Sequence, residues 1–329
     1  MVNNWLITGG CGFIGSSLIK RIITDYPKAN IRILDNLTVG SRRDLSEVCT
    51  FKEVSEESIA HSPEGVELLV GDICDESVCL KAGLGVDVIV HLAANTGVAP
   101  SVEDPRKDCA TNVVGTFNML EAARKEKVKR FVFASSGAPI GECEPPIHEE
   151  LAPHPVSPYG ASKLAGEGYC SAYHRSFGVG TVALRFGNVY GPRSKHKSSV
   201  IAKFIKQALA GEHLEVYGDG HQTRDYIYID DLVNAISMAA FKEEIGGEVF
   251  QIATNKETTI NEVVLKLIKI LENGKLGKPR IVNGKQRLGD VTRNFSDTSK
   301  AKSVLGWTAK VNLDKGIHST VQYFLDPPN

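Results

Sequence analysis

A tyrosine and a lysine four residues apart, Tyr159 and Lys163, form the pair in this sequence best suited to proton transfer. The preceding Ser157-Pro158 is a typical helix start, so both side chains are expected on one face of a helix, one turn apart. A phenol with a pKa of about 10 is a poor base at neutral pH, but a neighbouring ammonium group favours the phenolate. Ser136 follows the strand expected around Phe131-Val132-Phe133 and can share the proton. We therefore expect Ser136, Tyr159 and Lys163 to act together.

A glycine-rich turn near the start of the chain is suited to binding a dinucleotide. The apolar run Trp5-Leu6-Ile7 leads through Thr8 into this turn, and apolar residues with helical spacing follow it. Glycines permit a tight turn and a close backbone approach, while the helix N-terminus presents N–H groups and a partial positive charge to a pyrophosphate. The residues expected to contact the dinucleotide here are Gly9, Gly12, Phe13, Ile14 and Gly15.

Carboxylates after the next two strands indicate which dinucleotide binds. Asp35, followed by Asn36 in the same predicted site, lies 20 positions after Gly15. A carboxylate at this spacing can accept both ribose hydroxyls and repels a 2′-phosphate, which favours NAD over NADP. Asp72 can meet the adenine amine and the backbone of Ile73 the ring, although Asp72 as an ordinary loop residue is a serious alternative.

The elements that must position these residues are short apolar strands that alternate with helices. This order is typical of an α/β fold with a Rossmann-type, doubly wound parallel sheet, and near-continuous apolar strands fit burial on both faces. Residues 53–65 are polar and expected to form a loop. The expected strands are Trp5-Leu6-Ile7, Ile31 to Leu34, Val66 to Val70, Val86 to Val90, Phe131 to Phe133 and Val179 to Leu184.

The pattern changes after Arg185 and indicates a smaller C-terminal substrate-binding lobe. A turn-rich basic stretch is followed by an amphipathic helix over 200–209 and a glycine-rich segment at 218–220, while Phe250-Gln251-Ile252 is expected to rejoin the first sheet. The basic run Lys195-His196-Lys197 is interpreted as a solvated loop. We expect an NAD-binding domain at 1–187 plus roughly 225–255, interleaved with a substrate lobe at 188–224 and 256–329.

Composition limits the classes of partner. The 329 residues carry a formal net charge of -1, which gives no electrostatic reason to expect nucleic acid or an anionic membrane as a partner. The chain shows no secretion signal and no run of about 18 apolar residues. Its seven cysteines have no metal-binding spacing, which favours reduced thiols, a cytoplasmic location and no metal site.

Taken together, the motifs resemble the extended short-chain dehydrogenases/reductases, most closely the UDP-glucose/galactose and UDP-N-acetylglucosamine 4-epimerases. The resemblance runs from Thr8 to about Trp307. It implies that Ser136, Tyr159 and Lys163 are catalytic. Its matching stretches are Thr8 to Gly15, His91 to Ala94, Ser135-Ser136, Tyr159 to Lys163, Leu184 to Arg193, Gly218 to Asp231 and Arg287 to Asp290.

The resemblance also implies which residues hold the two ligands. Asn112 and the backbone of the stretch that contains Leu92, Ala93 and Ala94 would line the NAD. A nucleotide-sugar substrate would contact Asn188, Arg224, Arg287 and Asp290, where two arginines offer bidentate donors for a diphosphate. Asn294, seven residues after Arg287, has an intermediate size at a position that sorts plain from N-acetylated sugars. We lean towards acceptance of both sugars or of the N-acetylated form.

The implied reaction is NAD-dependent 4-epimerisation of a UDP-sugar through a transient 4-keto intermediate. Related dehydratases and decarboxylases place acidic side chains just after the catalytic hydroxyl, whereas this chain has Gly137 and Ala138 there. Pro139-Ile140-Gly141 departs from the common Val-Tyr-Gly and leaves the shape of the pocket open. A UDP-glucuronate 4-epimerase, a nucleotide-sugar 4-ketoreductase and a non-catalytic NAD-sensing regulator are the alternatives.

A homodimer is a further expectation. The helices around 113–125 and 158–174 carry apolar faces, and relatives pair through such helices as a four-helix bundle. Periodicity alone does not separate this arrangement from core burial.

Overall fold

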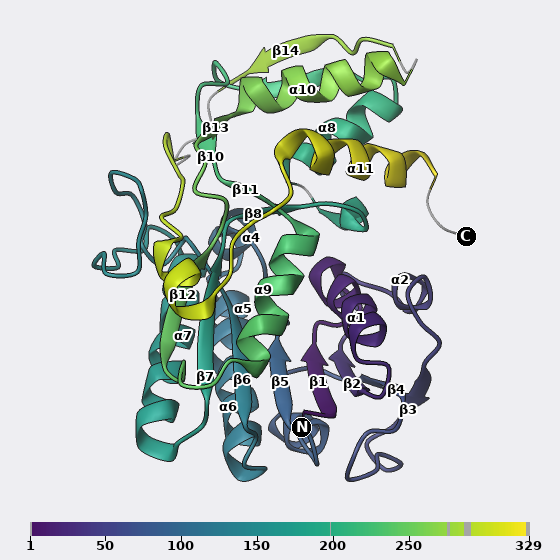
Figure 1. Cartoon of the computed structure of the whole chain (residues 1–329), viewed down its shortest axis with the longest axis vertical. Helices are drawn as coiled ribbons and strands as arrows, with labels where there is room; N and C mark the ends of the chain where they lie inside the picture. The colour runs from purple at the N-terminus through teal and green to yellow at the C-terminus, as the bar shows by residue number, and fades with distance from the viewer. Residues whose placement is uncertain (1, 198, 275–276, 286–290, 327–329) are drawn as a thin grey trace.

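Eight parallel strands form one sheet that runs through the larger part of the molecule (Figure 1). The computed structural model describes residues 2–197, 199–274, 277–285 and 291–326. The strand order is β12-β7-β6-β5-β1-β2-β4-β3, which reverses between β1 and β5 and confirms the predicted Rossmann-type fold. Ligands of such folds bind at the carboxyl ends of the strands beside this reversal. The strands of the sheet are β1 (Asn4–Thr8), β2 (Asn30–Asp35), β3 (Lys52–Val54), β4 (Val66–Val70), β5 (Val88–His91), β6 (Arg130–Ser136), β7 (Thr181–Phe186) and β12 (Glu248–Ile252).

Both faces of this sheet are covered by helices. Trp5 and Ile7 of β1 pack in the core that includes α1 (Phe13–Asp25) and α9 (Ile229–Phe241). Leu6 points the other way, into a second core, because successive residues of a strand face opposite sides. This two-sided burial explains why the strands are apolar along their whole length. The helices of the second face are α3 (Glu76–Ala82), α6 (Gly115–Lys125) and α7 (Pro158–Phe177).

The smaller lobe lies at the carboxyl ends of the strands (Figure 1). It contains the parallel pair β9 (Leu214–Tyr217) and β14 (Ile281–Gly284). The amphipathic stretch 200–209 forms a helix as predicted, and β12 rejoins the main sheet beside β7. The division into two domains at the stated boundaries stays a prediction. The helices of the lobe are α8 (Val200–Leu209), α10 (Ile260–Asn273) and α11 (Leu313–Leu325).

Three sequence expectations differ in detail from the structure. The segment expected to be a loop at 53–65 begins with the end of the edge strand β3, whose residues have too little apolar character to predict a strand. β5 and β7 begin two residues later than expected. Val86 and Val179 are buried but precede the hydrogen-bonded ladder, so burial alone misplaced both starts.

Several further elements of the fold are short. The short elements are α2 (Arg42–Ser46), α4 (Val98–Glu103), α5 (Pro105–Cys109), the π-helix η1 (Ala110–Val114), β8 (Asn188–Tyr190), the 3-10 helix η2 (Ser194–His196), β10 (Thr223–Arg224), β11 (Tyr226–Tyr228), β13 (Thr258–Thr259) and the π-helix η3 (Ala301–Leu305).

No helix among the described residues is long and apolar enough to cross a membrane. All seven cysteines lie in described ranges and are free thiols.

Candidate active site

The glycine turn between β1 and α1 is packed too tightly for side chains at two of its glycines. Gly9 has a φ of 68°, and a Cβ there would lie 2.9 Å from the backbone nitrogen of Ala93. A Cβ on Gly15 would lie 2.4 Å from the carbonyl oxygen of Gly9. Helix α1 starts at Phe13 with no side-chain cap at Gly12 and no acidic residue in its first turn. These features fit an anion such as a pyrophosphate at the helix N-terminus.

The loop after β5 is fastened to the glycine turn by Thr8. Its hydroxyl accepts hydrogen bonds from the backbone N–H groups of Leu92 and Ala93, both at 3.1 Å. The same hydroxyl lies 2.8 Å from Nδ1 of His91, whose Nε2 lies 3.1 Å from the hydroxyl of Thr116. Burial, helped by the charge of Lys163, lowers the pKa of His91 to about 3. His91 is therefore a neutral, packed residue and not a base.

Asp35 ends β2 with its carboxylate beside the glycine turn. One oxygen accepts a hydrogen bond from the N–H of Cys11 at 2.9 Å, and the other from the N–H of Leu37 at 2.8 Å. Burial raises the pKa of Asp35, while these two bonds lower it. Each carboxylate oxygen keeps a second lone pair, so the group fits the pair of ribose hydroxyls that the sequence assigned to it.

The other predicted adenosine residues lie next to Asp35. The side-chain amide of Asn36 donates to Asp72 at 2.9 Å, which joins the ends of β2 and β4. The carbonyl oxygen of Ile73 accepts from Asn118 and from the thiol of Cys79. Both lone pairs of this carbonyl oxygen are therefore used. The N–H of Ile73 is the backbone group that is suited to an adenine contact.

Ser136, Tyr159 and Lys163 meet at the carboxyl end of β6. Helix α7 starts as predicted, with the hydroxyl of Ser157 accepting from the N–H of Gly160 at 3.1 Å. The hydroxyl of Ser136 accepts from the N–H of Ala138 at 3.2 Å, and it lies close enough to Tyr159 to lower the pKa of that phenol. The Nζ of Lys163 lies 5.9 Å from the ring centroid of Tyr159. The structure thus brings the three predicted catalytic residues together.

Burial controls the protonation of this trio. It raises the pKa of Tyr159 to about 12, while the hydrogen bond from Ser136 lowers it and the charge of Asp108 raises it further. Burial lowers the pKa of Lys163 to about 8, against the opposing effect of Asp108. The lowering of the phenol pKa expected from the neighbouring ammonium is outweighed in the protein alone, because burial and the charge of Asp108 both raise this pKa.

The side chain of Asn112 forms hydrogen bonds with other residues of the chain. Its amide nitrogen donates to the carbonyl oxygen of Asn95 at 3.0 Å, to Asp108 at 2.9 Å and to the hydroxyl of Ser162 at 3.1 Å. Its oxygen accepts from the N–H of Asn95 at 2.8 Å. Asn112 therefore ties the loop after β5 to α7, and its predicted place beside the cofactor stays a prediction. Sequence reasoning missed Asp108, whose position four residues before Asn112 in a helical segment was the available signal.

Arg185 has a structural role. Its guanidinium forms a two-point ion pair with Glu167 of α7, at 2.8 and 2.7 Å. The hydroxyl of Ser135 donates to the same carboxylate at 2.6 Å. The hydroxyl of Ser135 is therefore already hydrogen-bonded within this buried cluster. Ser136 is the serine whose hydroxyl lies beside Tyr159.

The predicted substrate residues within the described ranges lie at the junction of the sheet and the smaller lobe. Nη1 of Arg224 donates to the carbonyl oxygens of Thr223 and Val291, both at 2.7 Å. The N–H of Asn294 donates to the hydroxyl of Thr223 at 3.2 Å, so Asn294 lies beside the same strand. Asn188 is exposed at the start of β8, which pairs with β11. Arg287 and Asp290 lie outside the described residues.

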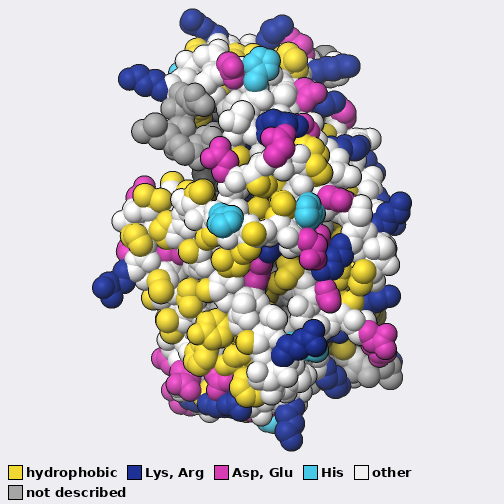
Figure 2. Space-filling model, turned by 90° about the vertical axis from the view of Figure 1, so that its left-hand side faces the viewer, with side chains coloured by type: hydrophobic (Ala, Val, Ile, Leu, Met, Phe, Trp, Pro, Cys, Tyr) yellow, Lys and Arg dark blue, Asp and Glu magenta, His cyan; other side chains and the backbone are white. Residues whose placement is uncertain are grey.

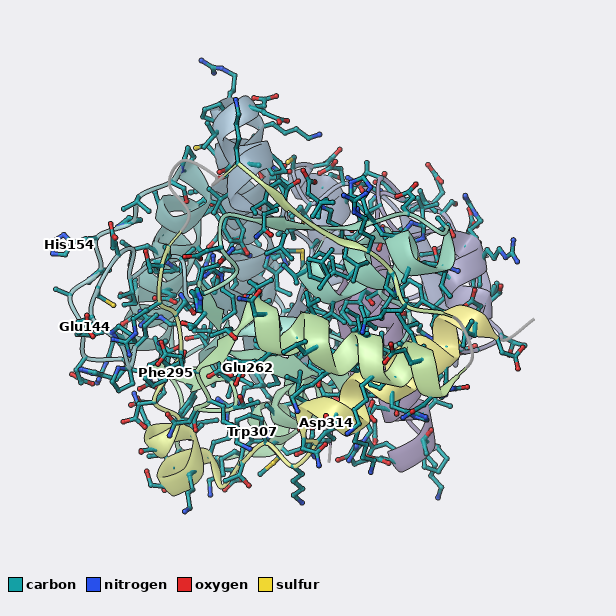
Figure 3. The ribbon with its side chains drawn as sticks, turned by 90° about the horizontal axis from the view of Figure 1, so that it is seen from above. Glu144, His154, Glu262, Phe295, Trp307 and Asp314 are labelled. Carbon is teal, nitrogen blue, oxygen red and sulfur yellow. The ribbon has the colours of Figure 1, made fainter. Side chains whose placement is uncertain are left out.

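The residues after Ser136 lack acidic groups and leave space. A Cβ on Gly137 would have no atom within 4 Å. Ile140 of the departing Pro-Ile-Gly sequence is buried, and the chain then runs outward to the edge of the molecule (Figure 3). There Glu144 pairs with Arg293 of the C-terminal part. The Pro-Ile-Gly sequence is thus accommodated by the burial of Ile140. The segment that follows it contacts the part of the chain that carries Asn294.

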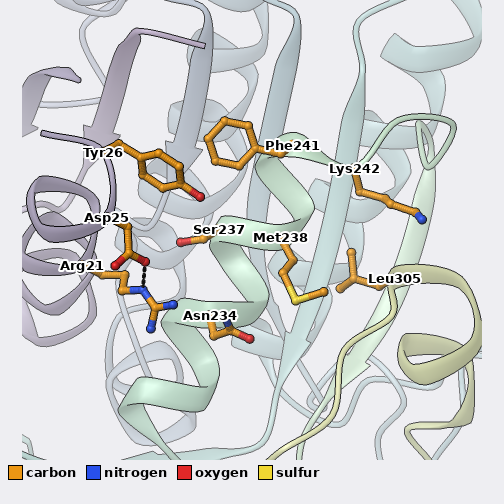
Figure 4. Close-up of a pocket in the computed structure, with 9 residues that line it drawn as sticks. All are labelled: Arg21, Asp25, Tyr26, Asn234, Ser237, Met238, Phe241, Lys242 and Leu305. Carbon is orange, nitrogen blue, oxygen red and sulfur yellow. Dashed lines mark hydrogen bonds and ion pairs between the residues drawn. The ribbon is translucent and has the colours of Figure 1, made fainter. Parts of the chain in front are cut away.

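A cavity of about 370 Å³ lies away from this site, between α1, α9 and Leu305 (Figure 4). Its lining includes Asp25 and Tyr26 at the C-terminal end of α1, whereas the glycine turn lies at the other end of that 13-residue helix. The buried hydroxyl of Ser237, which lines it, has no hydrogen-bond partner among the described residues. The cavity contains none of the predicted site residues, and we assign it no part in the chemistry.

The fold and the site define a Rossmann-type dinucleotide-binding enzyme with a serine, tyrosine and lysine trio. The model of the NAD dependent epimerase/dehydratase family matches residues 5–253, and the chain belongs to this family. This membership confirms the predicted enzyme class, an NAD-dependent epimerase, and NAD as its cofactor.

Relatives match along nearly the whole chain. A putative UDP-glucose 4-epimerase of Methanocaldococcus jannaschii is 36% identical over 323 residues, 97% of each chain. The structure of a Thermotoga maritima UDP-glucose 4-epimerase with UDP-glucose has a TM-score of 0.86 at 35% identity and covers 98% of each chain. A UDP-N-acetylglucosamine 4-epimerase of Methanobrevibacter ruminantium, solved with UDP-N-acetylmuramic acid, has a TM-score of 0.88 at 29% identity and covers 99% of each.

Proposed function

We propose that this protein interconverts UDP-sugars that differ in configuration at C4, with UDP-glucose/UDP-galactose, their N-acetylhexosamine counterparts, or both as substrates. The observation that carries the proposal is the placement of the Ser136 hydroxyl beside Tyr159, next to open space at Gly137. Epimerisation needs a base and room for the sugar to turn. Dehydration needs a further acid or base, which Gly137 and Ala138 cannot supply.

In this mechanism Tyr159 takes the proton from the C4 hydroxyl, and the neighbouring Ser136 shares it. NAD supplies a reversible hydride acceptor, so the reaction has no net redox change. The resulting 4-keto sugar turns to present its other face, and Tyr159 returns the proton. The high pKa of Tyr159 suits its step as an acid, while its step as a base requires the positive charge of the nicotinamide nearby.

Arg224, Asn188 and Asn294 are the described residues that we assign to the nucleotide sugar. Arg224 is attached to the strand that carries it and to Val291, so its guanidinium has a defined position for binding a diphosphate. Asp225, the next residue, is buried and accepts from the N–H groups of Thr254 and Ser296, which fixes the strand. Arg287 and Asp290, outside the described residues, remain part of the proposed site.

Acceptance of both plain and N-acetylated sugars is the finer proposal. Asn294 lies beside Thr223 at the edge of the proposed site, and its side chain is of intermediate size. Relatives named as UDP-glucose and as UDP-N-acetylglucosamine 4-epimerases are similar to the chain over nearly its whole length. For UDP-glucuronate, Arg185 offers no ready partner for a carboxylate because Glu167 already occupies it.

Direct conversion assays test the proposal. Purified protein is incubated with UDP-glucose, UDP-N-acetylglucosamine and UDP-glucuronate, with and without added NAD, and the 4-epimers are resolved by chromatography. We expect conversion of at least one of the first two. Conversion of none of the three would overturn the proposed function, and conversion of UDP-glucuronate alone would replace the substrate. Tyr159→Phe should abolish turnover while NAD stays bound, which separates an enzyme from an NAD sensor.

We also propose a homodimer formed through α6 and α7. Three aromatic side chains on these helices, Phe117, Tyr169 and Phe177, are exposed. Between ring centroids, Phe117 lies 5.7 Å from Tyr169, and Phe177 lies 5.0 Å from the buried Tyr173. Figure 2 shows hydrophobic side chains gathered on this side of the molecule. A second copy of the chain would bury them, because apolar faces of this kind mark association surfaces.

A cytoplasmic location is proposed on the state of the cysteines. All seven are free thiols, and three of them, Cys11, Cys79 and Cys170, are buried. Free thiols persist in reducing compartments. Cell fractionation with an antibody to the protein would test the assignment.

A further inference from the structure

The loop that follows Asp35 is packed directly on the glycine turn. A Cβ on Gly40 would lie 2.2 Å from the carbonyl oxygen of Cys11, and Asp35 itself accepts from the N–H of Cys11. The loop then continues into α2, whose N-cap is Ser41; the carboxylate of Asp44 completes a capping box by accepting from the N–H and hydroxyl of Ser41 at 3.0 and 2.6 Å. Displacement of residues 36–47 would therefore uncover the ribose side of the dinucleotide site.

Two carboxylates of this loop are held by residues from far along the chain. Nζ of Lys195 lies 2.9 Å from one oxygen of Glu47 and 3.2 Å from Asp44. The hydroxyl of Tyr323, in α11, donates to the other oxygen of Glu47 at 2.8 Å. The side chain of Glu47 is only 6% exposed and that of Asp44 12%. The basic run interpreted from sequence as a solvated loop thus contains a lysine in a two-carboxylate ion pair.

The charges of this cluster support one another. Burial acts to raise the pKa of Glu47, but hydrogen bonds from Lys195 and Tyr323 bring it below its usual value. Burial acts to lower the pKa of Lys195, but Glu47 and Asp44 raise it. The guanidinium of Arg193 lies 5.7 Å from the ring centroid of Tyr323. Largely buried, charge-assisted hydrogen bonds of this kind are stronger than ordinary surface ion pairs.

We propose that Lys195 and Tyr323 are positioning residues that keep the cofactor bound, by joining the C-terminal lobe to the loop that covers the ribose side of the NAD site. NAD would leave only when the contacts of Glu47 and Asp44 with these two residues open. This inference rests on the proposed function, because an epimerase regenerates NAD at every turnover and has no use for its release. Lys195 and Tyr323 touch neither ligand in this proposal and act through residues 36–47.

The test measures nucleotide release without any sugar. Protein loaded with NADH is mixed with excess NAD, and the loss of bound NADH fluorescence gives the dissociation rate. Lys195→Met and Tyr323→Phe should each speed release, Lys195→Met by roughly tenfold, as expected for a lost charged hydrogen bond. Glu47→Gln combined with Lys195→Met should release no faster than the faster single variant, since both changes open the same contact. Lys195→Arg should restore slow release.

Lys203→Met is the matched control, because Lys203 forms a comparable pair with Glu215 at 3.1 Å within the smaller lobe and away from residues 36–47. It should leave the release rate unchanged. The proposal is overturned if Lys195→Met and Tyr323→Phe melt like the wild type and release NADH at the wild-type rate, or if Lys203→Met speeds release equally. If Lys195→Met does not fold, the milder Tyr323→Phe decides the question. Because no sugar is present, the NADH release rates can be interpreted even if the epimerase assay shows no conversion.

Discussion

The ammonium group of Lys163 donates a hydrogen bond to the backbone carbonyl oxygen of Ala134 at 2.9 Å. Ala134 lies two residues before Ser136 on β6, and Lys163 lies one helical turn after Tyr159 on α7. This bond therefore holds the helix that carries the phenol against the strand that carries the serine. Ser136 and Tyr159, to which we assign proton transfer, thus lie on a strand and a helix. Such elements hold a site more rigidly than loops do.

The first prediction concerns the titration of Tyr159. Its pKa of about 12 means that the phenol of the protein alone stays protonated through pH 10, and the positive nicotinamide should move its ionisation to lower pH. Ultraviolet titration of wild type minus Tyr159→Phe isolates one of nine tyrosines. We expect phenolate below pH 10 with NAD and none without it. Identical titrations in both forms would refute this account of how the base is generated.

The second prediction uses two glycines with the same backbone conformation. Gly9→Ala should lose NAD affinity more than tenfold, because its Cβ would meet the backbone of Ala93 at 2.9 Å. Gly65 has a φ of 64° but open space around it, so Gly65→Ala should cost only about 1 kcal/mol of stability and leave NAD affinity unchanged. NAD titration by calorimetry, with urea unfolding in parallel, measures both. Equal NAD affinities in the two variants would contradict the account that NAD binding requires the close backbone approach between Gly9 and Ala93.

Part of this site followed from the sequence because its elements are local. The glycine turn, Asp35 and the Ser157-Pro158 start of α7 are each set by residues within a few positions of one another, and the structure places all three as expected. The parallel sheet was predictable because its strands are buried on both faces and read as apolar runs.

The rest depends on contacts between distant parts of the chain. Asn112 joins Asn95 and Ser162, 17 and 50 residues away, through its side chain alone. Lys195 reaches Glu47 across 148 residues, so its neighbours in sequence suggested only a solvated loop. The raised pKa of Tyr159 was also not predictable from the sequence, because the extent of its burial depends on the packed structure and not on the spacing of the motif.

The third prediction tests why the site lacks an acid after Ser136. Gly137→Asp should fold normally, since a Cβ there meets no atom within 4 Å. A carboxylate beside Tyr159 opposes formation of the phenolate, so the acid limb of the pH profile of kcat should move upward by about one pH unit. Gly137→Asn, of nearly the same size and uncharged, is the control and should keep the original limb. A shared shift in both variants would point to a steric effect.

The last prediction concerns the exposed faces of α6 and α7. Phe177 is 55% exposed and Phe117 37%, and a second copy of the chain is proposed to cover them. The double variant Phe117→Asp/Phe177→Asp should therefore sediment as a monomer at micromolar concentration, where the wild type should sediment as a dimer, because it places charges in an apolar contact. Leu265→Asp changes an even more exposed apolar residue, 64% exposed, on α10 and should leave the dimer intact. A wild-type monomer at this concentration would refute the dimer, and dissociation by Leu265→Asp would place the interface on α10 instead.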